Sequence, residues 1–372
     1  AVTSIAFWTV PTFFEGTAML CVLFICKILY EACYTMFNIP MGSLLSAMST
    51  NDSERASLSS ARGVGSMFGN AIPGFAGLAI VGAFGENNSI GYMITGTICA
   101  VVGFVFCLLH YALTEERVEV NEEAKADDIK ISDIFDVVKK NRAFVALCIH
   151  GVCICTMQYL AENISVYMYS AVYHDVTYKA IAQALSAPFM IGSMVFVPFM
   201  CKKLGLEKVI RYALLIGGAI CAVLFGMHMV MDVHPLLHGV ILGIGTGFAM
   251  VSIQMQWGLV GEAIDYNEYV TGKRTEGSIY GTFNLTRRIG QTIGNSAAVL
   301  ALGWIGYDTA LAAAGGVQAA SVLTGIKVLC VLVPGIFLIG SWAAFKYVWN
   351  ITPEIRAEMR AAKEAKAKKT AE

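Results

Sequence analysis

The chain contains a series of apolar runs of about 20 or more residues, the length that an α-helix needs to cross the hydrocarbon core of a bilayer. Of its 372 residues, 56% are hydrophobic and 14% are charged, whereas a soluble domain carries about 25% charged residues. Backbone polar groups cannot be left unpaired in lipid, so such runs must form helices. The sequence therefore predicts an all-α, multi-pass protein surrounded by the lipid bilayer. The net charge of −1 gives no reason to expect a nucleic-acid partner.

The apolar runs predict the positions of the helices. They lie near residues 1–13, 18–47, 57–84, 90–113, 143–171, 178–201, 209–231, 236–262, 277–303 and 322–349. The first run is too short to span a membrane alone. Because the chain starts inside an apolar run, we expect further helices to precede it in the complete fold.

The basic residues indicate how the chain is oriented. Of the 26 Lys and Arg residues, 21 fall on one set of alternate loops. These loops are 48–62, 114–142, 202–211, 263–276 and the tail from 346. By the positive-inside rule this side is cytoplasmic, which also places the C-terminus in the cytoplasm.

One long polar interruption divides the chain, and it carries no expected chemistry. The predicted parts are an incomplete N-terminal bundle of about four helices, a central cytoplasmic loop, a C-terminal six-helix bundle and a cytoplasmic tail. Their boundaries are 1–113, 114–142, 143–349 and 350–372.

Arg287 and Arg288 lie side by side within a predicted membrane helix. A charged side chain there is costly, so it normally faces the protein interior or a water-filled cavity. Asn284, Gln291 and Asn295 share a helix face with Arg288 by their spacing. Arg287 projects about 100° away, which favours a helix contact. The stripe with Arg288 predicts a polar ligand pathway.

Three other helices carry polar groups at the same spacing. These groups are Lys27, Glu31, Tyr34 and Asn38; Gln158, Glu162, Ser165 and Tyr169; and Gln254 with Trp257. Amide, hydroxyl and guanidinium groups beside aromatic rings suit a sugar site. Lys27 and Glu31 are spaced for an intrahelical ion pair. Glu162 is a candidate for coupling to a proton or sodium, with pairing to a basic neighbour as the alternative. Trp257 fits a cavity wall and a lipid-facing ring equally well.

No pattern of cysteine or histidine residues indicates a metal site or an enzyme. Most of the 11 cysteines lie in apolar runs, where they act as small buried hydrophobes. The histidines at 150, 174, 228, 234 and 238 are scattered, mostly near predicted helix ends. We therefore expect no cofactor other than the coupling ion.

Two polar loops occupy equivalent places in the two predicted halves. They read STNDSERASLSSAR and DYNEYVTGKRTEG. Clusters of acidic and basic residues there can form cytoplasmic ion pairs that break during transport. The candidates for this gate are Asp52, Glu54, Arg55, Asp265, Glu268, Arg274 and Glu276.

The runs NIPMGSLLSAMSTNDSERASLSSAR (38–62) and DYNEYVTGKRTEGSIYGTFNLTRR (265–288) resemble the two signature regions of the glycoside–pentoside–hexuronide:cation symporters. The resemblance covers the whole chain in layout and implies the major facilitator fold, with two six-helix bundles around a central loop. It also implies that the first two helices and part of the third lie outside this chain. Members of this family carry sugars or glycosides together with sodium or a proton by alternating access.

The resemblance assigns roles to particular residues. Tyr34 and Asn38 fall where the family has substrate- and cation-site residues, and Arg62 falls near an arginine that lines the sugar site. Arg288 aligns with a basic residue of the family's eleventh helix, with Asn284 one turn before it. Some members have an aspartate at the position of Asn38, whereas an amide supplies no charge to sodium. Arginine at 288 offers a planar donor fork that suits a carboxylate, as in a uronide.

The sequence and the resemblance together predict a monomer that imports a glycoside, pentoside or hexuronide with a cation across a bacterial inner membrane. The predicted substrate-binding residues are Tyr34, Asn38, Arg62, Gln254, Trp257, Asn284 and Arg288. Asn38 and Glu162 are the candidates for cation coupling. The alternatives are a major-facilitator exporter of another small solute and a membrane sensor that does not transport.

Overall fold

The structure is a computed structural model that describes residues 1–48, 89–115, 139–272, 276–313 and 315–359, with single positions between 61 and 84, at 137 and at 361–362. All the regular elements in these ranges are helices, which confirms the all-α prediction. The chain divides into two compact units, residues 1–127 and 128–372. We describe each unit by itself.

The first unit contains three described helices. They are α1 (Val2–Phe13), α2 (Gly16–Met48) and α4 (Ser89–Leu113). The short helix α1 packs against both α2 and α4. Trp8 of α1 stacks on Tyr92 of α4, with ring centroids 6.4 Å apart, and it lies where a side chain at Gly96 would be. The glycine therefore allows α1 to pack closely on α4.

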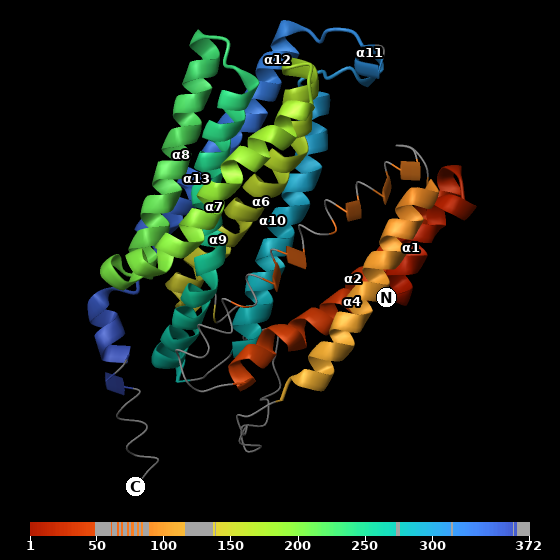
Figure 1. Ribbon diagram of the computed structural model, residues 1–372. Coiled ribbons are helices and arrows are strands. Elements are labelled where there is room, and N and C mark those ends of the chain that lie inside the picture. Colours follow the sequence, from red (N-terminus) through yellow and green to blue (C-terminus); the bar gives the residue numbers. More distant parts are fainter. Residues whose placement is uncertain are drawn as a thin grey trace. The chain divides into compact units, whose positions relative to one another are not determined.

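The second unit is a bundle of long helices that run side by side (Figure 1). Its first five long helices are α6 (Arg142–Tyr167), α7 (Thr177–Leu204), α8 (Leu206–Val230), α9 (Pro235–Thr271) and α10 (Glu276–Trp304). A π-helical segment, η1 (Met168–Val172), extends α6. After the short α11 (Thr309–Ala313), the last run joins α12 (Ala320–Lys327), η2 (Val328–Leu332), α13 (Val333–Ala343) and η3 (Ala344–Val348).

Glycines let the helices of the second unit approach one another closely. A Cβ atom at Gly290 of α10 would lie 2.6 Å from the carbonyl oxygen of Val152, and one at Gly294 would lie 2.7 Å from that of Thr156. The pair α6 and α10 makes the most extensive helix contact in the described part. Close backbone approach through small residues is typical of helices that pack in membranes.

The interior of the second unit is apolar. One cluster of fully buried side chains includes Phe144, Phe283 and Phe345, and another includes Met168, Leu224 and Ile326.

Six of the described helical stretches are long and apolar enough to cross a membrane. They are Gly16–Asn38, Ser89–Leu113, Arg142–Val172, Leu206–Val230, Pro235–Thr271 and Ala320–Val348. The prediction of several membrane spans is confirmed.

Two predicted loops proved to be much shorter. The polar segment 263–276 was expected to be a loop, but α9 continues to Thr271. Charged residues do not break a helix, and α9 ends only at Gly272, whose φ of 72° is left-handed. The predicted loop 202–211 is likewise reduced to Gly205, with φ 84°, because α7 ends at Leu204 and α8 starts at Leu206.

Some predictions fall outside the described residues. These concern most of the helix expected at 57–84, together with Arg62, Asp52, Glu54, Arg55 and Arg274. The same holds for the side chain of Glu276, although its backbone begins α10.

Candidate functional site

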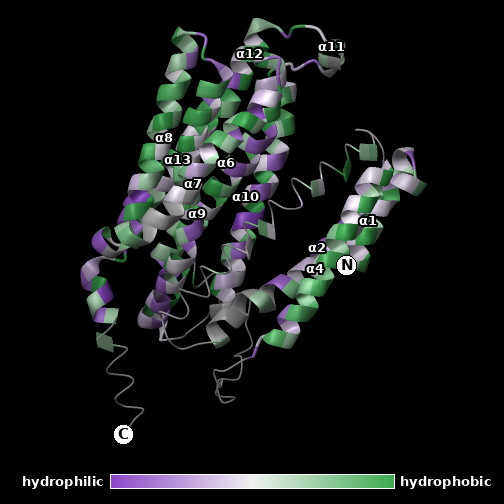
Figure 2. Cartoon of the chain, in the orientation of Figure 1, coloured by the Kyte–Doolittle hydropathy of each residue, from purple (hydrophilic) through white to green (hydrophobic). Residues whose placement is uncertain are grey.

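A polar stripe follows α10 in the second unit. Arg288 is exposed, and its Nη1 donates to Oε1 of Gln291 at 3.4 Å. Asn284, one turn before Arg288, is partly buried and donates to the carbonyl oxygen of Tyr280 at 3.1 Å. Asn295 continues the stripe one turn after Gln291 and is exposed. Hydrophilic residues recur along this helix (Figure 2), so the shared face that the spacing predicted is present.

Helix α6 borders this stripe with amides and hydroxyls of its own. Asn163 donates to Oδ1 of Asn295 at 2.9 Å and to the carbonyl oxygen of Tyr159 at 2.7 Å. About two turns earlier on α6, the hydroxyl of Thr156 donates to the carbonyl oxygen of Gly290 at 3.1 Å. The stripe is therefore held against α6 by hydrogen bonds as well as by the close glycine contacts. Asn163 was not among the predicted site residues.

An aromatic cluster lies near the first turns of α10. Trp257 of α9 is half-buried and stacks on Tyr280, with ring centroids 5.3 Å apart at an angle of 29°. It also makes an edge contact with Phe283 at 5.5 Å. The ring of Trp257 on α9 thus packs against α10. Gln254, one turn earlier on α9, is exposed.

Arg287 and Arg288 differ in their surroundings although they are adjacent. The guanidinium of Arg287 lies over the ring of Trp257, with Cζ 5.3 Å from the centroid. Its stem packs against α6, where a Cβ atom at Gly151 would be 3.3 Å from Cγ of Arg287. The predicted helix contact for Arg287 is therefore present, and of the two residues it is Arg288 that is exposed.

Glu162 of α6 forms an ion pair with Lys179 of α7, with 3.0 Å between Oε1 and Nζ. The carboxylate side chain is 66% exposed and the lysine side chain is 20% exposed. The polar face predicted for α6 does not continue to Tyr169. That residue is only 4% exposed and packs inward within η1, whereas Glu162 is exposed.

Two of the predicted site residues of the first unit, Tyr34 and Asn38, lie along α2. Tyr34 is 40% exposed and stacks on Tyr30 at 6.4 Å, and Asn38 is partly buried. The expected ion pair between Lys27 and Glu31 is present at 2.9 Å. These residues belong to a different unit from Arg288 and Trp257.

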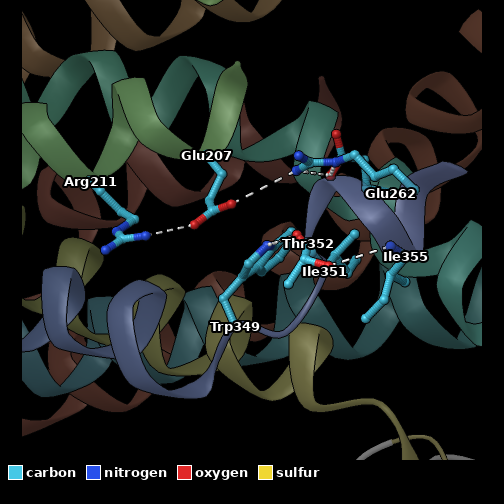
Figure 3. Close-up of polar contacts among 8 residues, drawn as sticks. Glu207, Arg211, Glu262, Trp349, Ile351, Thr352 and Ile355 are labelled. Atoms are coloured by element: carbon cyan, nitrogen blue, oxygen red, sulfur yellow. Dashed lines mark hydrogen bonds and ion pairs between the residues drawn. The ribbon is translucent and has the colours of Figure 1, made fainter. Parts of the chain in front are cut away.

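A network of ion pairs joins α8 and α9 to Arg356, which lies in the segment after η3. Arg211 lies 3.0 Å from Glu207 within α8, and Arg356 lies 2.8 Å from Glu262 of α9 and 4.0 Å from Glu207 (Figure 3). The predicted gate residues Asp265 and Glu268 are on the last turns of the same helix α9. Sequence reasoning missed this network because Arg356 is far in the sequence from Glu207 and Glu262.

Sequence reasoning also missed a pair of buried histidines. Nε2 of His228 lies 2.9 Å from Nδ1 of His238, although the sequence had suggested that the histidines are scattered. The short connection between α8 and α9, residues 231–234, was the available signal, because residues at similar distances from a tight helical turn lie side by side. Nearby, burial raises the pKa of the Tyr173 hydroxyl above its usual range.

No group of three or more His, Cys, Asp or Glu residues that could hold a metal ion occurs among the described residues.

Comparison with known proteins shows the family. Residues 1–351 match the family model described as MFS/sugar transport protein, and the chain belongs to this family. The major facilitator fold that the sequence resemblance implied is thereby confirmed. With its apolar helices, the chain is a multi-pass membrane protein.

Three relatives illustrate the range of the family. The chain is 28% identical to the glucuronide carrier protein homolog of Escherichia coli K12, over 85% of this chain and 66% of that protein. It is 26% identical to the isoprimeverose transporter of Lactiplantibacillus pentosus, over 96% and 74% of the two chains. It is 25% identical to a putative 2,3-dihydroxypropane-1-sulfonate exporter of Salmonella typhimurium, over 93% and 74%. The chain thus spans about two thirds to three quarters of these relatives' lengths.

Proposed function

We propose that this protein imports a sugar that carries a negative charge, such as a hexuronide, together with a proton or sodium. The observation that carries the proposal is the exposed residue Arg288 on the amide-rich stripe of α10. A positive charge in a membrane helix is costly unless it has a role in a polar pathway. The planar guanidinium of Arg288 can bind the acidic group of an anionic substrate.

The chemistry of the stripe fits such a substrate. Arginine presents a rigid fork of donors that matches the two oxygens of a carboxylate. Asn284 and Asn295 on the same face can donate to and accept from sugar hydroxyls. Trp257 supplies an aromatic ring against which the C–H face of a sugar can pack. Gln254 adds an exposed amide on α9. Tyr34, Asn38 and Arg62 of the first unit remain candidates for substrate binding from the sequence and the resemblance.

The names of the relatives support this choice of substrate class. One is a glucuronide carrier homolog and another a sulfonate exporter, and both named solutes are anions. The isoprimeverose transporter is named for a neutral disaccharide, so the family as a whole does not require a charged substrate. The exposed Arg288 is what favours an anion for this chain.

The remaining features of the proposal follow the sequence. The protein would work as a monomer in a bacterial inner membrane, with its C-terminus in the cytoplasm, where basic loops collect. It would have no enzymatic activity and no cofactor apart from the coupling ion. Asn38 and Glu162 remain candidates for coupling, and Asp265 and Glu268 for a cytoplasmic gate.

Uptake by cells that express the complete gene tests the proposal. The solutes would be radiolabelled methyl β-D-glucuronide, methyl β-D-glucoside and methyl β-D-xyloside, under an imposed sodium or pH gradient. Accumulation of the glucuronide above the other two is expected. Preference for a neutral glycoside would contradict the proposed substrate class, and no accumulation of any of them would contradict import.

Export is the second candidate function, and one relative named as an exporter favours it. The same cells would be loaded with labelled glucuronide and diluted into sugar-free medium. Loss of label that is faster than in cells without the protein, combined with no uphill uptake, would support export over import.

A further inference from the structure

His228 and His238 form a closed pair at one end of the second unit. His228 lies two residues before the end of α8, and His238 is the fourth residue of α9. The two rings meet at 65° with centroids 5.0 Å apart. The side chains are 5% and 0% exposed, so the hydrogen bond between Nε2 and Nδ1 at 2.9 Å is shielded from solvent.

Two tyrosines close one side of this pair. The ring of Tyr169 lies 5.9 Å from that of His238, and the ring of Tyr173 lies 5.6 Å from it. Gly239, next to His238, is what admits the hydroxyl of Tyr169, because a Cβ atom there would overlap it. The outer nitrogen of His238, Nε2, is buried without a hydrogen-bond partner among the described residues.

Every neighbouring element brings titratable groups toward the pair. Lys327 of α12 is the cation that acts on His228. Cys330 of η2 faces the two tyrosines, and Lys179 of α7 acts on Cys330 while paired with Glu162. Tyr178 of α7 packs against the exposed His234 at 5.8 Å.

We propose that His228 and His238 together bind one proton, and that this proton drives transport. Two facing imidazole nitrogens hold a single hydrogen between them, so the neutral pair has one donor and one acceptor at the contact. One added proton gives an imidazolium hydrogen-bonded to an imidazole, which is a stronger, charge-assisted contact. A second added proton would place two like charges side by side. The coupling role rests on the proposed function, whereas the binding of the proton does not.

A metal ion does not fit between these two rings. Zinc bonds imidazole nitrogen at about 2.0–2.1 Å with tetrahedral angles, which holds two such nitrogens about 3.4 Å apart. The observed separation of 2.9 Å is that of a hydrogen bond.

The closed pair of His228 and His238 in this structure corresponds to the form without the added proton. A charge on the pair would add to that of Lys327 in a region shielded from water, where like charges repel strongly. The proton would bind when a movement of α12 takes Lys327 away from His228. Such a movement links the charge of the pair to the conformation of the bundle, as a coupled transporter requires.

Solid-state 15N NMR of the purified protein in lipid, without sugar, tests the binding of the proton. The six histidines would be labelled, and the pair would be assigned in the wild-type protein by the correlation between its two facing nitrogens. Between about pH 8 and 5, the range in which ordinary histidines change charge, this pair is expected to gain one shared proton. A pair that stays neutral throughout would overturn the proposal, whatever the protein transports.

Variants then connect the proton to transport. His228→Gln and His238→Gln keep a hydrogen-bonding side chain but cannot be charged. His234→Asn is the matched control, because His234 is exposed and caps α9 by accepting from the amide of Leu236, a role that asparagine also fills. In proteoliposomes, accumulation of labelled methyl β-D-glucuronide under a pH gradient is expected to vanish in both glutamine variants and persist in the control.

Exchange of labelled for unlabelled methyl β-D-glucuronide across the proteoliposome membrane, with the same pH on both sides, serves as the folding control. Glutamine variants that exchange sugar but do not accumulate it would support coupling through the pair. Accumulation at the wild-type level in either variant would overturn it. Wild-type accumulation driven by sodium and indifferent to the pH gradient would also overturn it while leaving the proposed function intact. Absence of wild-type exchange would contradict the proposed substrate, and the NMR result would still decide the proton site.

Discussion

Asn163 and Asn295 join α6 to α10 through a hydrogen bond of 2.9 Å between their side-chain amides. The bond lies at one end of the polar stripe that contains Arg288, and the glycines 290 and 294 bring the two backbones together beside it. The position of the stripe therefore depends on how closely these helices pack.

Substitution of Gly294 by alanine is expected to separate the two helices. The added Cβ would lie 2.7 Å from the carbonyl oxygen of Thr156, and overpacking of this kind costs about 1–3 kcal/mol. Thermal unfolding of the purified protein should show the loss. Gly303→Ala on the same helix is the control, since a Cβ there meets no atom within 4 Å, and equal destabilisation by both variants would contradict the account.

The ion pair of Glu162 and Lys179 predicts a rescue experiment. Glu162→Gln leaves the ammonium of Lys179 without its carboxylate, and that side chain is only 20% exposed. Folded protein in the membrane is expected to fall, and Lys179→Met in the same chain should restore it because no charge remains unpaired. If the double variant recovers folding but not accumulation of sugar, Glu162 also takes part in coupling.

Trp257 predicts a change in apparent affinity. Its ring contacts Tyr280, Phe283 and the guanidinium of Arg287. Trp257→Ala removes the proposed sugar platform and should raise the KM for uptake by about tenfold, equivalent to about 1.4 kcal/mol, whereas Trp257→Phe should have a smaller effect. Trp304→Ala is the control, because that ring is 84% exposed at the end of α10. An unchanged KM in Trp257→Ala would exclude the tryptophan from the site.

The C-terminal segment predicts a change in proteolysis. Arg356 is held at 2.8 Å from Glu262 and 4.0 Å from Glu207, so Glu262→Gln should weaken the docking of the residues that follow. Faster trypsin cleavage at the basic tail is expected in the detergent-solubilised protein. Glu358→Gln, which removes one exposed contact with Tyr269, should have a smaller effect.

The same segment predicts a pH dependence. A hydrogen bond from Thr352, together with one from its own backbone amide, holds the pKa of Glu354 below its ordinary value of 4.5. A lowered folded-state pKa means that the ionised carboxylate stabilises this folded segment at pH values above the ordinary pKa, and that this contribution is lost as the pH falls through the lowered pKa. Tail cleavage by an acid-active protease should rise over that interval, and Glu354→Gln should flatten the rise.

Much of the fold could be predicted because hydrophobic runs determine it. The runs that became α4 and α8 were placed within a few residues, since apolar length alone identifies a membrane helix. The polar end of α9 was predicted to be a loop, because hydropathy distinguishes apolar from polar residues but does not show which polar residues are helical. Asp265 to Thr271 continue the helix, and only Gly272 ends it.

The site was less predictable than the fold. Spacing on one helix correctly grouped Asn284, Arg288 and Gln291, because the helical period fixes their shared face. Contacts between helices, such as Asn163 with Asn295 or His228 with His238, depend on the rotation of each helix about its axis. No periodicity within one segment contains that information.

The central claim is that Arg288 binds the acidic group of an anionic sugar. The most direct measurement compares uptake of labelled methyl β-D-glucuronide and methyl β-D-glucoside by cells expressing the wild type, Arg288→Gln and Arg288→Lys. Arg142→Gln serves as the control, because Arg142 is an exposed arginine at the start of α6. The account predicts that Arg288→Gln loses glucuronide uptake by about tenfold or more, since a charge-assisted contact contributes about 1.5–3 kcal/mol. Arg288→Lys should retain part of this uptake, and the control should retain nearly all of it. Glucuronide uptake at the wild-type level in Arg288→Gln would contradict the claim.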